Sequence, residues 1–319
     1  MPASRLIPVQ YPDSLWGYLS CTRTGSNKFE FSPAVGAKFR DAFPFSPDDL
    51  ALVQYDQRDL SDAATERMGQ RRADVFGGTI PLETKWGYIG QSGDLVISTL
   101  FSAANAFFGG RACVRTGVHY GFIGRTGEFE IAPSFENAKP FSSGYAPVSS
   151  IIGDDELWGM IDWDGVQVVG MKYRSLGQMS EGMVAFTDSN GHCGYLNSLF
   201  RVAIAPRFEM AGRFREWVAA VSEGGFWGFI NNLGDYVIEP QYDNAYPFRD
   251  GLARVCLDGQ WGYIDKSNEI IIPFEFDDCT DFSGGVAGVQ MGDRWAFIGR
   301  DSSGKDGLLT DPSYIRIRK

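Results

Sequence analysis

Residues 241–273, QYDNAYPFRDGLARVCLDGQWGYIDKSNEIIIP, decide the fold, because this stretch is the clearest copy of a unit that recurs along the chain. Short apolar or alternating runs are separated in it by Gly, Asp and Asn, which are turn residues. Its parts are, in order, an aromatic with an acidic turn (Tyr242-Asp243), a Pro-Phe pair (Pro247-Phe248), a Gly-Leu-Ala-Arg-Val strand (251–255), the pair Trp261-Gly262 and an apolar strand (269–272). The unit is therefore predicted to consist of β-strands.

The Trp-Gly pair sets the period of the repeat. Successive anchors lie 70, 34, 38, 35, 34, 34 and 34 residues apart, and a fixed period of this size indicates a repeat architecture. Five copies keep the pair, with Trp at positions 16, 86, 158, 227 and 261, and the three degenerate copies are Tyr120-Gly121, Cys193-Gly194 and Trp295-Ala296.

Other positions keep the same register. An aromatic stands fifteen residues after six of the anchors, as Phe101, Phe135, Tyr173, Phe208, Tyr242 and Phe276. The Gly-x-Ala-x-Val pattern starts at residues 110, 144, 251 and 285, with looser copies over 49–53, 182–186 and 217–221. Gly stands seven residues after four anchors, at positions 93, 127, 165 and 234, which indicates a tight hairpin turn because Gly takes a left-handed backbone at little cost.

With these columns, the chain resembles the WG-repeat (Trp-Gly repeat) family over about residues 11–300. The resemblance implies a bacterial-type, β-rich repeat protein of the kind that usually serves as a binding or accessory surface. No catalytic motif belongs to the repeat itself, so the resemblance implies no catalytic residue and no cofactor.

The repeat predicts an all-β fold in which each unit of about 34 residues forms a three-stranded antiparallel meander. A single unit cannot bury its apolar face alone, so neighbouring units must pack on each other. Three strands per unit favour an open or gently curved solenoid. A closed propeller-like ring is the alternative. It is less favoured because a four-stranded blade usually needs about 40 residues or more, and the unit has only about 34. We expect Phe141, Phe214, Phe248 and Phe282 to pack between units.

The chain is predicted to hold one repeat domain over residues 1–300. The long first step falls on residues 54–84, which are either an insertion into a hairpin or a degenerate repeat; within them, 62–72 has the composition of a short helix. Residues 301–319 form a tail outside the repeat, and the alternating run 314–318 is predicted to be a capping strand.

The composition narrows the class of partner and the compartment. A net charge of −11 disfavours binding to nucleic acid and favours steering of a basic partner. No run of 18 apolar residues and no signal-peptide pattern occurs, so we expect a monomeric cytoplasmic protein without a membrane span, secretion by a signal-less route being the alternative. The five cysteines have no metal-ligand spacing and are expected to be small buried residues in a reducing compartment.

The sequence predicts no catalytic residues, no metal site and no cofactor. The two histidines, His119 and His192, stand in a column that elsewhere holds Leu, Lys, Phe, Gln or Arg, which marks a variable structural position. Paired carboxylates such as Asp277 and Asp278 fall in turn columns, where their side chains bond to the local backbone.

Binding candidates are the residues that depart from the repeat. Trp163 stands at a hairpin tip, Phe200 replaces the usual tip Gly, and Trp217 opens a strand beside Arg213 and Arg215. Exposed aromatics next to charges are typical interface anchors, whereas aromatics that pack on a neighbouring unit are structural. For Trp217 the structural interpretation is preferred, and for Trp163 the binding one. The other candidates are Asp154, Asp155 and Glu156 in an extension beside Ile151 and Ile152, and the basic cluster Arg67, Arg71 and Arg72.

The function predicted from these features is a non-catalytic scaffold that binds another protein. One form is a protein that neutralises or modulates a basic effector, toxin or enzyme, to which the acidic charge is suited. The alternative is a carbohydrate- or cell-wall-binding module that uses exposed Trp, and it requires tryptophans that the core does not cover. An enzyme with its site in 54–84 is the third hypothesis, and that segment contains no His and no Cys.

Overall fold

The computed structural model describes residues 5–11, 14–23, 29–55, 85–300 and 306–308. Within these ranges every regular element is a β-strand, and no helix occurs. The chain divides into two compact units, one made of Met1–Glu156 with Ile161–Gln167 and the other of Leu157–Met160 with Val168–Lys319. The predicted all-β repeat fold is confirmed.

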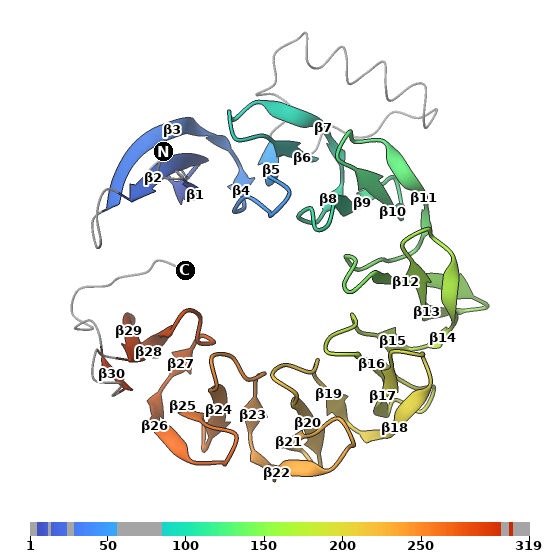
Figure 1. The fold of residues 1–319 in the computed structure, drawn as a ribbon, viewed down its shortest axis with the longest axis vertical. Coiled ribbons are helices and arrows are strands. Elements are labelled where there is room, and N and C mark those ends of the chain that lie inside the picture. Colours follow the sequence, from blue (N-terminus) through green and yellow to red (C-terminus); the bar gives the residue numbers. More distant parts are fainter. Residues whose placement is uncertain (1–4, 12–13, 24–28, 56–84, 301–305, 309–319) are drawn as a thin grey trace. The chain divides into compact units, whose positions relative to one another are not determined.

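The strands of the first unit follow one another without other elements in the described part of the chain (Figure 1). They are β1 (Arg5–Gln10), β2 (Trp16–Arg23), β3 (Phe29–Phe39), β4 (Asp41–Ala42), β5 (Ala51–Tyr55), β6 (Lys85–Ile89), β7 (Leu95–Phe101), β8 (Ala103–Ala104), β9 (Arg111–Thr116), β10 (His119–Gly124), β11 (Phe129–Phe135) and β12 (Tyr145–Ile152). The boundary between the units falls within β13 (Asp155–Asp162) and β14 (Gln167–Tyr173).

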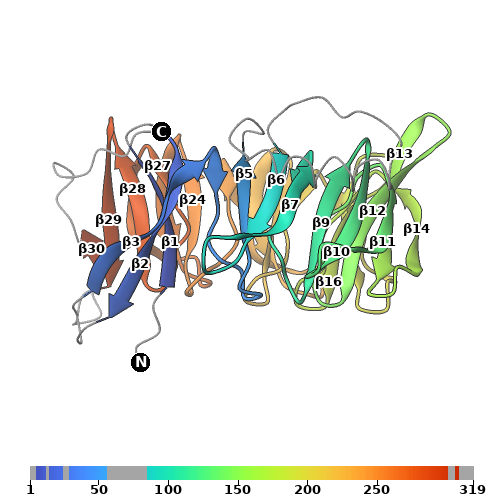
Figure 2. The same ribbon diagram turned by 90° about the horizontal axis from the view of Figure 1, so that it is seen from above.

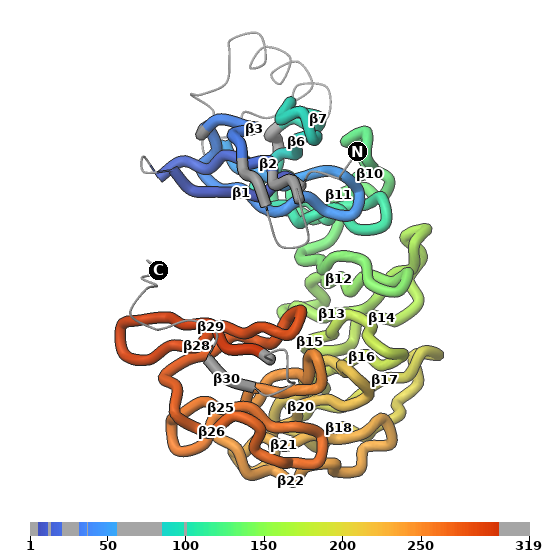
Figure 3. The backbone as a smooth tube through the Cα atoms, turned by 60° about the vertical axis from the view of Figure 1, so that its left-hand side comes forward, coloured from blue at the N-terminus to red at the C-terminus, as the bar shows by residue number. Residues whose placement is uncertain are grey.

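The second unit continues in the same way. Its strands are β15 (Ser175–Leu176), β16 (Met183–Thr187), β17 (Cys193–Asn197), β18 (Val202–Phe208), β19 (Met210–Ala211), β20 (Ala219–Glu223), β21 (Phe226–Ile230), β22 (Tyr236–Tyr242), β23 (Asn244–Ala245), β24 (Ala253–Leu257), β25 (Gln260–Ile264), β26 (Ile270–Phe276), β27 (Asp278–Cys279), β28 (Val286–Met291), β29 (Arg294–Arg300) and β30 (Asp306–Leu308). The smooth trace in Figure 3 follows the hairpin from β28 to β29.

Most of the described sheets have four strands and not three. In the sheet β23-β24-β25-β26 the two-residue strand β23 pairs first, with Asn244 opposite Cys256, and the three longer strands follow in chain order. Figure 2 shows the longer strands of such a sheet, β9, β10 and β11, running beside one another. Four antiparallel strands in sequential order make up a propeller blade. The prediction that each repeat forms a three-stranded meander of an open solenoid is therefore wrong. Most repeats instead form a four-stranded blade, as the propeller-like alternative requires.

The two three-stranded sheets are β1-β2-β3 and β12-β13-β14. In the second of these, an isolated bridge between Ala138 and Val148 stands where the short first strand lies in other sheets. The segment that crosses from one unit to the next therefore also pairs, through Ala138, with a strand of the next unit.

The Gly of the Trp-Gly pair is required by close contact with the next strand. A Cβ on Gly228 would lie 2.5 Å from the Ile238 carbonyl oxygen, and one on Gly262 would lie 2.7 Å from the Ile272 carbonyl oxygen. At both places the register between the two strands shifts, as in a β-bulge. In the last sheet Ala296 replaces this Gly, and the described pairing of β29 with β30 covers residues 298–300 only. The close contact at the bulge thus explains the Gly.

A buried tyrosine ties each of four sheets to the segment that follows it. The Tyr18, Tyr88, Tyr195 and Tyr263 side chains are fully buried. Their hydroxyl groups donate hydrogen bonds to the backbone carbonyls of Phe43, Asn105, Gly212 and Thr280, at 2.7–2.8 Å. Because a buried carbonyl without a partner is costly, these bonds fix the path of the chain between sheets.

Replacing Tyr263 by Phe is expected to lower the free energy of unfolding by about 1–3 kcal/mol, since the Thr280 carbonyl would lose the 2.8 Å bond from the hydroxyl while the ring remains. Urea denaturation followed by circular dichroism measures the change. The matched control is Tyr246→Phe, at a ring that is 37% exposed, for which a change within about 0.5 kcal/mol is expected. Equal effects of the two substitutions would show that the Tyr263 hydroxyl does not support the fold.

The predicted packing of four phenylalanines between units is confirmed within each compact unit. Phe141, Phe214, Phe248 and Phe282 are all buried. Each meets the aromatic ring two residues after an anchor at 4.8–4.9 Å between centroids, in edge-to-face geometry; the pairs are Phe122–Phe141, Tyr195–Phe214, Phe229–Phe248 and Tyr263–Phe282.

Residues 56–84 connect two neighbouring strands of one sheet, because Val53 of β5 pairs with Gly87 of β6, as Val255 pairs with Gly262. The helix expected over 62–72 and the capping strand expected over 314–318 lie outside the described residues. Within the predicted tail, β30 pairs with β29 as the fourth strand of the last sheet.

Candidate functional site

Two-residue turns at the start of the second strand of the sheets share one conformation. In the second unit, Glu181-Gly182, Asp250-Gly251 and Gly284-Gly285 have φ angles of 52 and 77, 52 and 80, and 62 and 78°. Each is flanked by a bridged pair, such as Arg249 and Leu252. Two successive positive φ angles define the type I′ hairpin turn, which strongly favours Gly at its second position.

Trp217 departs from this rule. The Glu216-Trp217 turn has φ angles of 52 and 71°, so a bulky aromatic occupies the place of Gly. A left-handed backbone costs a residue with a Cβ about 1–2 kcal/mol. The Trp217 side chain is 68% exposed, so its burial does not offset that cost. Strained backbone of this kind is concentrated at functional sites.

Carboxylates hold these turns together in a row within the second unit. The Glu181 carboxylate accepts hydrogen bonds from the backbone N–H groups of Glu216 and Trp217, at 2.8 and 2.7 Å. The Glu216 carboxylate accepts one from Gly251 at 3.2 Å, and the Asp250 carboxylate accepts one from Gly285 at 2.9 Å. The strained turn is therefore held by two hydrogen bonds from its neighbour, which pre-organises Trp217.

Basic side chains surround the Trp217 turn. The Arg213 guanidinium donates a hydrogen bond to the Gln178 side-chain oxygen at 3.0 Å. Partial desolvation lowers the pKa of Arg213, and the nearby charges of Arg215 and Arg249 lower it further. The Lys266 ammonium donates to the Glu216 carbonyl at 2.9 Å and pairs with the Glu216 carboxylate at 3.1 Å.

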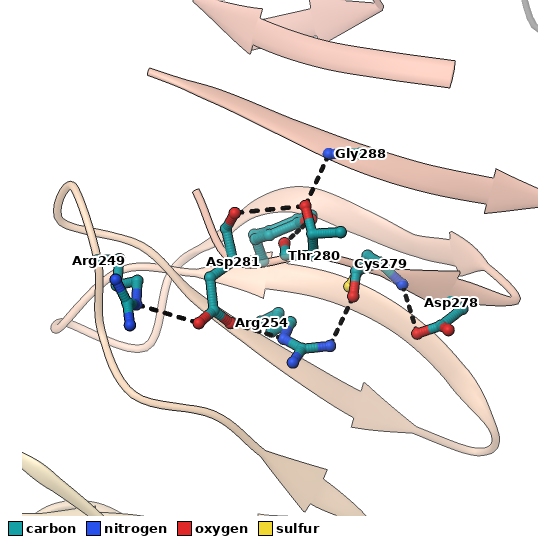
Figure 4. A network of polar contacts seen from close by, with 8 residues as sticks. Arg249, Arg254, Asp278, Cys279, Thr280, Asp281 and Gly288 are labelled. Atoms are coloured by element: carbon teal, nitrogen blue, oxygen red, sulfur yellow. Dashed lines mark hydrogen bonds and ion pairs between the residues drawn. The ribbon is translucent and has the colours of Figure 1, made fainter. Parts of the chain in front are cut away.

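Arg249 also belongs to a network beside the row (Figure 4). The Asp281 carboxylate pairs with the Arg249 guanidinium at 3.1 Å and with the Arg254 guanidinium at 2.7 Å. Arg254 is mostly buried, and it also donates to the Cys279 carbonyl at 2.5 Å. This network fixes the Arg249 side chain close to the turns.

The sequence model of the family described as WG containing repeat matches residues 86–117, 120–150, 194–225, 227–261 and 261–295. These matches cover slightly more than half of the chain. The protein belongs to the WG-repeat family. No curated protein matches this WG-repeat protein.

Several solved structures are similar to the WG-repeat protein in fold. Kluyveromyces lactis Hsv2 with loop 6CD replaced by a Gly-Ser linker is 8% identical, with 86% of this chain and 98% of that chain covered and a TM-score of 0.49. BamB from Moraxella catarrhalis is 11% identical, with 97% and 98% covered and a TM-score of 0.45. Apo AztD from Citrobacter koseri is 10% identical, with 96% and 94% covered and a TM-score of 0.42. At TM-scores below 0.5, none of these likenesses assigns a function to the WG-repeat protein.

The structure reverses the order of the two tryptophans that the sequence proposed. Trp163 is half-buried: its ring meets Phe141 at 4.7 Å between centroids, and the Arg111 guanidinium lies 4.2 Å from its centroid. Arg111 also donates a hydrogen bond to the Trp163 carbonyl. The packing that was expected of Trp217 is thus found at Trp163, and the exposure that was expected of Trp163 is found at Trp217.

Phe200 does take the tip position of Gly, as its φ of 57° shows, and its side chain is half-buried. Asp154 and Asp155 are exposed at the tip of the β12–β13 hairpin. Glu156, by contrast, accepts hydrogen bonds from the Ser149 hydroxyl at 2.7 Å and from the Asn137 amide at 2.9 Å. Arg67, Arg71 and Arg72 lie outside the described residues. The part that these residues play in binding stays a prediction.

Both turn carboxylates bond to backbone N–H groups, but only the bond of Asp278 is local as the sequence predicted, because the partner of Asp277 lies fifteen residues away. The Asp277 carboxylate accepts from the Gly292 N–H at 2.6 Å, and the Asp278 carboxylate accepts from the Cys279 N–H at 2.8 Å. The described residues include no group of three or more His, Cys, Asp or Glu side chains that could hold a metal ion. They also include no helix long and apolar enough to cross a membrane.

The four described cysteines, Cys113, Cys193, Cys256 and Cys279, are buried and free, as the sequence predicted of them. Burial raises the pKa of the Cys113 thiol to about 12 and that of the Cys279 thiol to about 11, where the Tyr263 hydroxyl and Arg254 oppose the rise. The reactive form of cysteine is the thiolate.

At pH 8 we expect Cys113 and Cys279 of the native protein to react with iodoacetamide at least about 100-fold more slowly than in urea, because a raised pKa lowers the thiolate fraction and burial blocks access. Raising the pH to 9.5 would leave both thiols protonated in the folded protein. Mass spectrometry of the alkylated peptides measures each site separately. Rapid alkylation of Cys279 in the folded protein would contradict its burial.

The Trp217 site could have been found from the sequence by one comparison. Residues 110, 144, 251 and 285 of the Gly-x-Ala-x-Val column are all Gly, and the copy over 217–221 starts with Trp. Reading this Gly as the second residue of a type I′ turn would have marked Trp217 as strained. The carboxylate row carries no such signal, because its donors are backbone N–H groups.

Proposed function

We propose that this WG-repeat protein is a non-catalytic scaffold that binds another protein, with Trp217 as the anchor of the interface. The observation that carries the proposal is a tryptophan that is 68% exposed at a φ of 71°, in a turn where other copies have Gly. The Trp217 side chain lowers the stability of the fold and adds no buried contact. Its presence is therefore explained by a contact with a partner.

The neighbours of Trp217 support a protein partner. Trp and Arg are the residue types enriched among the few that dominate binding energy at protein interfaces. Arg213 and Arg215 stand four and two residues before Trp217 in the chain, and the Glu181 carboxylate keeps the turn in place without covering the ring. A pre-organised anchor loses little conformational entropy on binding.

The net charge of −11 is the basis for proposing a partner that is basic overall, such as an effector, toxin or enzyme whose activity the scaffold modulates. The β12–β13 hairpin offers a suitable surface for contact, since Ile151 and Ile152 are 54 and 52% exposed beside the exposed Asp154 and Asp155. An association rate that falls steeply with salt would support this charge complementarity, and a flat salt dependence would contradict it.

Carbohydrate binding is the second candidate function, because Trp217 supplies the exposed tryptophan that this alternative requires. Trp fluorescence titrated with soluble cell-wall glycans tests it. A saturable change that disappears in Trp217→Ala would favour the glycan over the protein partner.

Affinity capture from the native lysate tests the main proposal, with the captured protein then purified and its affinity measured. The variant is Trp217→Ala. The matched control is Phe226→Ala, which removes a 49% exposed aromatic from the other end of the same sheet, where Glu223 pairs with Phe226. We expect a stoichiometric partner that binds the wild type and the control and that the variant binds at least about 30-fold more weakly. Equal capture by all three proteins would overturn the proposal.

A further inference from the structure

We propose that the partner segment bound at the Trp217 turn is an acidic peptide segment, whose carboxylates pair with Arg213 and Arg215 while an apolar side chain packs on the Trp217 ring. This inference rests on the proposed function, since it names the chemistry of the segment that the scaffold binds. It concerns two arginines, Arg213 and Arg215, whose charge is opposite in sign to the net charge of the whole protein.

The first support is the difference in how the neighbouring basic side chains are paired. Arg249 is paired with the Asp281 carboxylate at 3.1 Å, and Lys266 with the Glu216 carboxylate at 3.1 Å. Arg213, in contrast, donates its 3.0 Å hydrogen bond to the neutral amide of Gln178. The Arg213 guanidinium thus keeps donors for a carboxylate, and its fork geometry suits bidentate binding.

The second support is the crowding of positive charge. Arg215 and Arg249 lie close enough to Arg213 to oppose its positive charge. Like charges held together destabilise one another, and an anion that binds among them relieves that repulsion. The repulsion therefore contributes to the affinity for an acidic segment.

The carboxylates at the site do not remove this preference, because they face the row of turns. Glu181 accepts hydrogen bonds from the backbone of Glu216 and Trp217. Glu216 pairs with Lys266 and accepts a bond from Gly251, and Asp250 accepts one from Gly285. Each of these carboxylates makes at least one bond that holds the turns, whereas Arg213 is exposed.

An acidic peptide suits the site better than a nucleic acid. The basic surface is confined to a few side chains, and the net charge of −11 would repel a long phosphate backbone on either side of it. A short segment with two or three carboxylates meets the arginines without that repulsion. Trp217 supplies the apolar contact that a peptide side chain uses and that a phosphate does not.

Selection from a random 12-residue peptide display library on the full-length protein tests the inference. Wild type, Trp217→Ala and the double variant Arg213→Glu, Arg215→Glu serve as baits. The control is Arg174→Glu, a single charge reversal at an exposed arginine. Arg174 bonds to Thr187 at the end of β16, whereas the Glu181 turn lies at the start of that strand. We expect the wild type and the control to enrich peptides rich in Asp and Glu with one large apolar residue. The double variant is expected to lose these peptides and to enrich basic ones, and binding of a selected acidic peptide should weaken by at least about tenfold.

The outcomes separate the two proposals. Peptides that depend on Trp217 but are neutral or basic would leave the protein-binding scaffold standing and would overturn the acidic segment. Acidic peptides that the double variant binds equally well would also overturn it. If the wild type enriches no peptide over Trp217→Ala, the scaffold proposal and the acidic segment both fail. Circular dichroism of each bait, with wild-type spectra expected, confirms that the comparison is between folded proteins.

Discussion

Replacing Trp217 by Gly is expected to stabilise the second unit by about 0.5–1 kcal/mol and to weaken partner binding by at least about 30-fold. The left-handed backbone at a φ of 71° costs a residue with a Cβ about 1–2 kcal/mol, and the larger chain entropy of Gly offsets about 0.5–1 kcal/mol of the gain. The ring is 68% exposed, so its removal leaves no cavity. The loss of binding follows from the removal of the aromatic anchor.

Urea denaturation by circular dichroism gives the stability of this variant, and titration of the purified partner gives its affinity. Trp217→Ala is the matched control, because it removes the ring but keeps a Cβ at the same backbone position. It should lose binding without the gain in stability. Wild-type affinity in Trp217→Gly would show that the turn is not the interface. A loss of stability would show that the ring packs on the fold.

Replacing Gly228 by Ala is expected to lower the free energy of unfolding by about 3 kcal/mol or more. The new Cβ would lie 2.5 Å from the Ile238 carbonyl oxygen, 2.7 Å from the Pro240 nitrogen and 2.8 Å from the Glu239 carbonyl carbon. All three atoms belong to the backbone of β22, so no side chain can turn away to make room. The bulge would have to open, and the pairing of Trp227 with Tyr242 would be lost with it.

The control for Gly228→Ala is Ala296→Gly, the reverse exchange at the equivalent position of the last sheet. It should cost only about 0.5–1 kcal/mol, the usual penalty for Gly in a strand. The midpoint of urea denaturation measures both. If Gly228→Ala costs no more than the control, the Trp-Gly signature does not originate in the bulge.

The sequence predicted the repeat well because its columns are fixed by packing. The anchor Gly, the aromatic fifteen residues later and the phenylalanines that pack between units each have one steric role in the copies that keep them. The fourth strand was missed because β23 has only two residues, Asn244 and Ala245. A strand of two residues shows no alternation, and its pairing partner, Cys256, is identified only by the three-dimensional register.

The site was predicted in part, since Trp217 and its arginines were among the candidates but were given less weight than Trp163. Trp163 stands at a tip between two acidic residues, which suggested exposure, yet Arg111 and Phe141 from preceding parts of the chain cover it. Contacts between residues so distant in sequence leave no local pattern. In the sequence Trp217 looked like the start of a core strand because it stands at the beginning of the apolar run 217–221.

The row of carboxylate links has a consequence for how such a chain diversifies. The Glu181 carboxylate accepts a hydrogen bond from the backbone N–H of residue 217. The Glu216 and Asp250 carboxylates likewise accept hydrogen bonds from the N–H groups of residues 251 and 285. Since every residue except proline supplies that N–H, the identity of the side chain at these positions is uncoupled from the link. Single substitutions at these turns can therefore change the exposed side chain at one turn after another, while the hydrogen bonds that link neighbouring turns are kept.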